Sequence, residues 1–325
     1  MKRSFLSACT LLLAFASLTS SAQNTQGKTE DLGRIVVNSY VSDQIDGLPA
    51  SAKSMLTNKL SQITTANGLG GSEIQPRFII TPNITVLSKN ITPTAPPMHA
   101  YTLEVTLYIG DGIEGTKFAS TSLELQGAGT NEAKAYIAAL KQLNPNNADI
   151  QAFVEKGKVK IVEYYNSHCD FILKEAKTLE SQQMFEEAIY KLSSVPEVCK
   201  ECFDKSMDAV APIYQKQIDR ECEMQLAKAQ NAWSSGQNIQ AADEAAGYLA
   251  GIEPAATCFS KATALSKTIA ARVKELDKRE WNFKLKEQQD EVNIRKATIS
   301  AARDIGVAYG NNQPKSVTYN IRGWW

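Results

Sequence analysis

The stretch Cys169-Asp-Phe-Ile-Leu-Lys-Glu-Ala is repeated 53 residues later as Cys222-Glu-Met-Gln-Leu-Ala-Lys-Ala. A second pair of matching stretches follows, in which Cys202-Phe203-Asp204-Lys205 corresponds to Cys258-Phe259-Ser260-Lys261. Both copies have the apolar spacing of helices. A helical repeat of this length predicts stacked helical hairpins, an architecture that usually binds other molecules.

The whole second half of the chain has a helical pattern. Helices are predicted near residues 149–181, 184–195, 200–235, 238–252 and 257–308, the last in one piece or two. The spacing of Ala176, Phe185, Ala188 and Leu192 resembles tetratricopeptide repeats. Those repeats are only about 34 residues long, so the resemblance extends to paired helices and not to the strict consensus. We therefore predict an all-α helical-hairpin domain over residues 149–310.

Residues 1–22 have the pattern of a secretory signal peptide. Lys2 and Arg3 supply the positive start, residues 11–18 form a short apolar core, and Ser20-Ser21-Ala22 offers small residues for cleavage. Cys9 resembles a lipoprotein cysteine but precedes the apolar core. The sequence thus predicts an exported protein that is periplasmic or associated with the outer membrane, with peripheral membrane contact at most.

The cysteines that follow this segment are expected to form disulfides, because export leads to an oxidising compartment. From Cys169 a helix runs to a break near Ser181, and a second helix returns, which brings Cys199 or Cys202 level with Cys169. The second copy runs in the same way from Cys222 to Cys258. We predict a Cys222–Cys258 bond and a bond from Cys169 to Cys202 or Cys199, and the repeat favours Cys202.

Cys199-x-x-Cys202 has an alternative interpretation as a redox pair or half of a zinc site. No second cysteine pair has zinc spacing, and the chain has two histidines, His99 and His168. We expect no metal site.

Residues 33–145 have the pattern of an α+β domain. Strands are predicted over 34–41, 77–87, 101–109 and 116–125, and helices over 48–63 and 130–143. The third strand alternates strictly, with Tyr101, Leu103, Val105, Leu107 and Ile109 on one side. We predict an antiparallel-rich sheet with helices on one face.

This part of the chain resembles a family of bacterial envelope domains. The resemblance is carried by Ile35-Val36-Val37, by Arg77-Phe78-Ile79-Ile80, and by the hairpin that leads into Gly127-Ala128-Gly129-Thr130. Asp111, Gly115 and Ala133-Lys134-Ala135 match the family's Asp-x-x-x-Gly and alanine-helix pattern. The family includes the curli secretion component, activators of penicillin-binding proteins and the N-terminal domain of TolB. The resemblance implies an envelope assembly or regulatory factor of a Gram-negative bacterium.

The motifs that could carry chemistry are weak. Gly110-x-Gly112-x-x-Gly115 fits a dinucleotide fingerprint as a string, but strands are predicted on both sides of it, which favours a hairpin turn. No Gly-x-Ser-x-Gly or His-Glu-x-x-His motif occurs. Lysine plus arginine (35) equals aspartate plus glutamate (35), so no overall charge attracts nucleic acid. We expect no enzymatic activity, no cofactor and no nucleic-acid partner.

Four aromatic residues are candidates for partner binding: Tyr319, Trp324 and Trp325 in the tail over 311–325, and Trp281 farther upstream. Chain ends usually fray, so two terminal tryptophans need a surface that buries them. The tail is predicted to be strand-like, packing on the body of the protein or adding to a partner's sheet. Trp281 precedes apolar residues seven apart, Leu285, Val292 and Ile299, on a segment that either caps the helical stack or binds a partner.

These features together predict an exported, non-enzymatic envelope protein. Its helical repeats would serve as a protein-binding scaffold or assembly factor. The alternative is a regulator of a cell-wall or outer-membrane machine that acts through the α+β domain. The partner's identity and the oligomeric state stay open.

Overall fold

The computed structural model describes residues 33–43, 45, 47–71, 77–278, 281, 283–286, 294–313 and 317–325. The predicted signal peptide lies outside the described residues. The chain has an α+β fold, as predicted, with a mixed four-stranded sheet in the order β1-β2-β3-β4. The strands are β1 (Asn38–Ser39), β2 (Phe78–Ile91), β3 (His99–Asp111) and β4 (Thr116–Gly129).

The first strand is shorter than the sequence indicated. It pairs with β2 in parallel through only two residues, whereas β2, β3 and β4 form an antiparallel meander. The residues on either side of β1 also form backbone hydrogen bonds. Val37 N donates to Leu69 O at 2.9 Å, and Tyr40 N donates to Ile80 O at 2.9 Å. The segment is therefore held between β2 and the loop that follows the first helix.

The first face of the sheet carries the apolar side of β3. This side is buried by α1 (Ala50–Ala66), α2 (Glu132–Leu140) and the first half of α3 (Ala148–Ser181). Asn131 caps α2 by accepting a hydrogen bond from Lys134 N at 2.9 Å. The strict alternation of β3 predicted this face correctly: Tyr101, Leu103, Val105, Leu107 and Ile109 are all buried.

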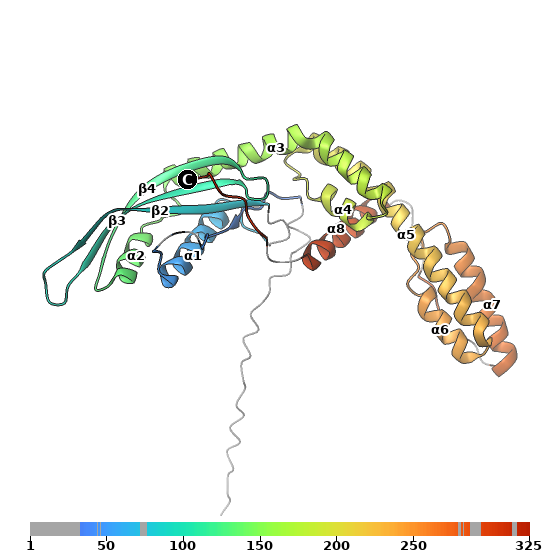
Figure 1. Ribbon diagram of the computed structural model, residues 1–325. Helices are drawn as coiled ribbons and strands as arrows, with labels where there is room; N and C mark the ends of the chain where they lie inside the picture. Colours follow the sequence, from blue (N-terminus) through green and yellow to red (C-terminus); the bar gives the residue numbers. More distant parts are fainter. Residues whose placement is uncertain are drawn as a thin grey trace, which may run out of the picture.

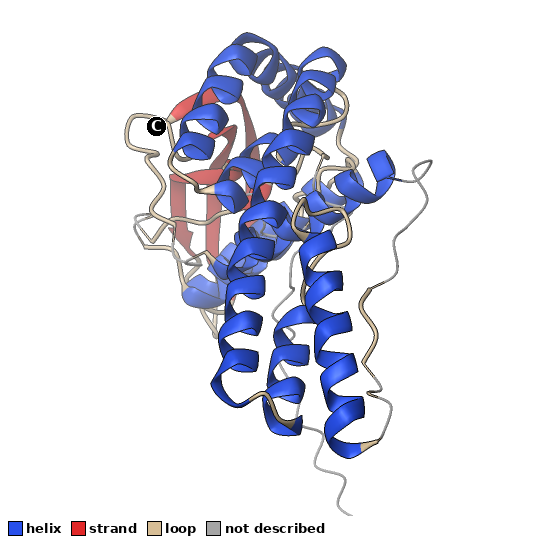
Figure 2. Cartoon of the chain, turned by 90° about the vertical axis from the view of Figure 1, so that its right-hand side faces the viewer, coloured by secondary structure: helices blue, strands red, loops and turns tan. Residues whose placement is uncertain are grey.

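The helices of the second half follow as α4 (Phe185–Ser193), α5 (Lys200–Gly236), α6 (Ile239–Leu249) and α7 (Phe259–Asp277). Figure 1 shows α3 running from the sheet to the other helices and α5 leading away from them. The end of α5 packs with α6 and α7, and we call these three the helical arm. Figure 2 shows them lying side by side.

Two disulfides brace these helices in the predicted way. Cys169 on α3 is bonded to Cys202 on α5, and Cys222 on α5 is bonded to Cys258, the residue before α7. Cys199 is unbonded and buried. Each bridge therefore joins a long helix to the second helix after it along the chain, α3 to α5 and α5 to the start of α7.

The apolar core is divided in the middle of α5. The first core is continuous from the sheet through α3 and α4 to Ile213, and the second begins at Ile218 and fills the arm. Pro212 lies at this division and has no backbone N–H to bond the preceding turn. The sheet thus shares one core with α3, α4 and the first part of α5, which we call the first helical layer. The predicted limit between the two domains, near residue 145, runs through this core.

The predicted helix over 257–308 is in two pieces. α7 ends at Lys278, which has a positive φ of 55°, and α8 (Ile294–Asn312) packs on α4 and α5. Val292, one of the three residues spaced by seven, lies outside the described residues. The segment before α8 packs on the helical arm, as one of the two expectations had it, because Trp281 and Leu285 lie against the arm's core. α8 itself lies beside α4 and α5.

The C-terminal tail packs on the second face of the sheet and forms no strand among residues 317–325. Ile321 and Trp324 are buried against Ile79 and Tyr108. This close approach of the tail to the sheet requires glycine at the end of β3 and in the turn that follows it. A Cβ on Gly110 would lie 2.7 Å from the Trp324 ring, and one on Gly112 would lie 2.5 Å from the Tyr319 ring.

Candidate functional site

A groove lies between the β3–β4 turn and the helices α3, α4 and α8. Its larger hollow has a volume of about 530 Å³, and an adjoining hollow of about 320 Å³ continues it toward α5. Both hollows are lined by Glu187 and Tyr309, so they form one surface, which we call the central groove.

The sheet side of the central groove is held by a buried carboxylate. Asp111 is buried, and its Oδ2 accepts a 2.6 Å hydrogen bond from Arg77 Nε. Its Oδ1 accepts the backbone N–H groups of Ile113 and Glu114, both at 2.9 Å. This fixes the turn, as in other loops capped by aspartate. Gly115, with φ 79°, completes the hairpin, so the Gly110-x-Gly112-x-x-Gly115 motif is a turn between two strands.

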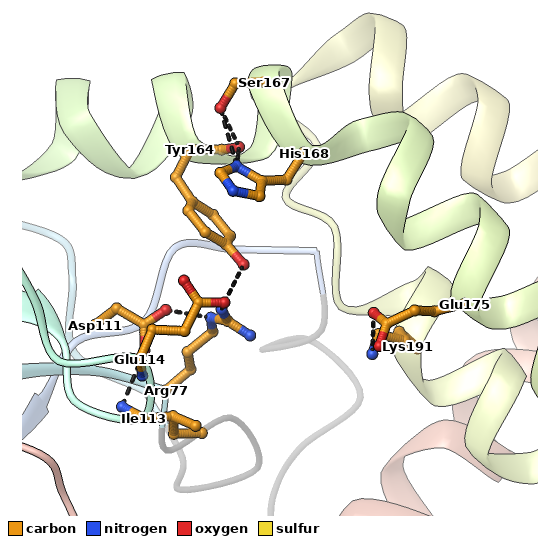
Figure 3. Close-up of polar contacts among 9 residues, drawn as sticks. All are labelled: Arg77, Asp111, Ile113, Glu114, Tyr164, Ser167, His168, Glu175 and Lys191. Atoms are coloured by element: carbon orange, nitrogen blue, oxygen red, sulfur yellow. Dashed lines mark hydrogen bonds and ion pairs between the residues drawn. The ribbon is translucent and has the colours of Figure 1, made fainter.

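Arg77 joins this turn to α3. Its guanidinium also pairs with Glu114 and lies 4.7 Å from the centroid of the Tyr164 ring. Tyr164 Oη donates to Glu114 Oε1 at 3.4 Å, and the His168 ring stacks on the tyrosine ring with 4.3 Å between the ring centroids. Figure 3 shows these side chains converging between the turn and α3. The positive charge of Arg77 is thus shared between two carboxylates and an aromatic face.

The opposite wall is formed by α4 and α8. Lys191 Nζ lies 2.5 Å from Glu175 Oε2 of α3, a pair also drawn in Figure 3. The Tyr190 ring lies 5.5 Å from the Tyr309 ring. Burial raises the pKa of Tyr164 to about 12 and that of Tyr190 to about 12, so both hydroxyls stay protonated at neutral pH. The groove is therefore lined by protonated tyrosine hydroxyls, aromatic rings and ion pairs.

The predicted partner-binding residues do not meet at this groove. Trp324 is 3% exposed, and its Nε1 donates to Gly115 O at 2.8 Å. Trp325 is 43% exposed beside Tyr108, and the Tyr319 ring lies 4.6 Å from that of Tyr40. Trp281 Nε1 donates to Asp243 Oδ1 of the arm at 3.4 Å. The tail is thus packed on the protein's own sheet, and partner binding by these residues stays a prediction.

Sequence reasoning did not find the groove residues. Arg77, Tyr164, Tyr190 and Tyr309 are far apart along the chain, and no motif joins them. One usable signal was present: Asp111 was singled out for its pattern with Gly115, and it is the carboxylate that orients Arg77.

The cysteines and possible metal ligands give no further site. Burial raises the pKa of the Cys199 thiol to about 11, and this Sγ faces the Val162 carbonyl at 4.0 Å. Within the described ranges, no cluster of three or more histidine, cysteine, aspartate or glutamate side chains is placed to hold a metal ion.

Because the tyrosines of the groove are buried, we expect the free energy of unfolding to fall at alkaline pH. The folded protein holds the protons of Tyr164 and Tyr190 more tightly than the unfolded chain, because burial raises their pKa from 10.0 to about 12. The stability from this difference is complete below about pH 10 and is lost as the pH rises to about 12. Urea unfolding at about pH 9 and pH 11 should show a fall on the order of 1 kcal/mol per tyrosine. Tyr190→Phe should reduce this fall, and an unchanged fall would contradict the assignment.

No described helix has the length and apolar character needed to cross a membrane. Comparison of the chain with protein-family models, with curated protein sequences and with solved structures gives no match.

Proposed function

We propose that the protein is an exported, non-enzymatic envelope protein that acts as a protein-binding scaffold. The observation that carries this proposal is the central groove. It combines two adjoining hollows with aromatic walls and ion-paired charges, and such concave apolar surfaces with a few fixed polar groups are where proteins bind ligands.

The arrangement of the helices supports the same proposal. We infer that α3–α4–α5 and α5–α6–α7 are two copies of one helical unit, because each joins a long helix to a short one and is braced by a disulfide in the same place. Stacked units of this kind form extended surfaces that serve for binding. The two disulfides support export to an oxidising compartment.

Photo-crosslinking in intact cells tests the proposal. A photoreactive amino acid would replace Phe171, which lies in the groove and is 57% exposed. We expect a discrete crosslinked product that contains a second protein.

The control position is Val159, which lies on the same helix, is 48% exposed and does not line the groove. Equal products from both positions, or none from Phe171 while the protein is present and folded, would refute a scaffold that works through the groove.

A further inference from the structure

We infer that the central groove binds a protein segment that is both cationic and apolar. This inference rests on the proposed function and names the chemistry of the partner. Two features of the groove lead to it: exposed apolar side chains gathered along its length, and carboxylates that outnumber the cations that face them.

The first feature is a set of exposed apolar side chains that line the central groove. Ile113, Phe171, Met184 and Met224 are all large, more than two-fifths exposed, and lie along the two hollows. Contiguous exposed apolar surface commonly marks an interaction site. Methionine side chains are flexible and polarisable, so Met184 and Met224 suit a surface that adapts to a partner's side chains.

The two cations that line the larger hollow, Arg77 and Lys191, are already paired, and its carboxylates Glu114, Glu175 and Glu187 outnumber them. Arg77 is paired with Asp111 and Glu114, and Lys191 with Glu175. Neither cation is therefore free to attract an acidic ligand.

The smaller hollow has an excess of negative charge. It is lined by Glu186, Glu187 and Glu221, against one cation, Arg220, which donates to the Gln183 carbonyl at 3.3 Å. In the described part of the chain no cation forms an ion pair with these three carboxylates. Lysine or arginine side chains of a partner would supply the missing charge, as complementary interfaces do.

A buried acceptor lies in the same place. Gln217 lines the smaller hollow, is 7% exposed, and donates through Nε2 to Glu221 Oε1 at 3.1 Å. Its Oε1 receives no hydrogen bond from the residues that the structure describes. A ligand that brings N–H donors would satisfy this acceptor, which again favours a cationic partner.

Fluorescence anisotropy with synthetic peptides tests the inference on the purified, oxidised protein. The probes are fluorescein-labelled peptides of about 12 residues: one of lysine and leucine, one with glutamate in place of lysine, and one with serine in place of leucine. We expect the lysine–leucine peptide to bind at least about tenfold more tightly than either of the others, and to weaken as salt is added.

A matched pair of variants separates the groove from the overall charge. Glu186→Gln/Glu187→Gln/Glu221→Gln should weaken binding of the lysine–leucine peptide about tenfold or more. Glu124→Gln/Glu155→Gln/Glu244→Gln changes the net charge equally at exposed carboxylates that do not line the groove, and should leave binding within about twofold. Circular dichroism melting would show that both variants are folded.

Each contrary result has a defined meaning. Equal losses in the two triple variants, or equal binding of the glutamate–leucine peptide, would overturn the cationic assignment. Crosslinking at Phe171 would still support a scaffold in that case. If crosslinking at Phe171 is absent but the lysine–leucine peptide still binds selectively, the proposed scaffold role in cells is rejected. The preference of the groove for cationic, apolar segments would then still hold.

Discussion

Removal of the Cys222–Cys258 bridge, by Cys222→Ser/Cys258→Ser, is expected to unfold the helical arm while the sheet stays folded. Alanine is the most frequent residue in the core of the arm, including Ala229, Ala242, Ala245 and Ala262, and small side chains bury little apolar surface. The bridge joins residues 36 apart in sequence. Closing a loop of that size stabilises a fold by about 3–4 kcal/mol, a large fraction of what such a core supplies.

Hydrogen exchange measured by mass spectrometry would detect this local unfolding. Amides of α6 and α7 should lose protection in the variant, whereas those of β3 should keep it. The matched control is Cys169→Ser/Cys202→Ser, whose bridge lies in the core shared with the sheet and rich in large side chains. Equal protection of the arm with and without the Cys222–Cys258 bridge would contradict the expectation.

Trp324→Ala is expected to cost about 3–5 kcal/mol of docking free energy and to release the C-terminal tail. The indole is buried against Tyr108, and its Nε1 bonds Gly115 O at 2.8 Å. Lys117 Nζ also donates to the Trp324 carbonyl at 2.9 Å, so releasing the residue breaks polar contacts as well. Residues 317–325 form no helix or strand, so their release leaves the described helices and strands in place. The loss of global stability therefore cannot exceed the free energy with which the tail is docked.

Limited proteolysis and denaturant unfolding would measure these two effects. Trp325→Ala is the control, since the neighbouring tryptophan is 43% exposed and should cost less than about 1 kcal/mol. Similar effects of the two substitutions would mean that the tail is not held by the Trp324 ring.

The elements with strong local patterns were predictable from the sequence. The strict alternation of Tyr101 to Ile109 identified β3 and its buried face. Helices that run out and return bring level residues together, so the spacing identified the Cys222–Cys258 bridge and paired Cys169 with Cys202 or Cys199. The repeat favoured Cys202, which is the cysteine that is bonded.

Features set by tertiary packing were not predictable in the same way. The position of α8 depends on where its apolar face is buried, and Ile299 and Ala302 pack on the first core, which their spacing along the chain did not specify. The tail alternates like a strand, yet among residues 317–325 only Ile321 and Trp324 are buried, at a site that Gly110 and Gly112 leave open. The groove combines residues from distant segments of the chain, so no local sequence motif predicted it.

The buried Cys199 has a consequence for oxidative folding. A chain that combines disulfides with an unbonded thiol is exposed to disulfide scrambling, in which a thiolate attacks a finished bridge. Burial raises the pKa of Cys199 to about 11, so roughly one molecule in ten thousand carries the thiolate at neutral pH. The native connectivity, once formed, is thereby protected from its own spare nucleophile.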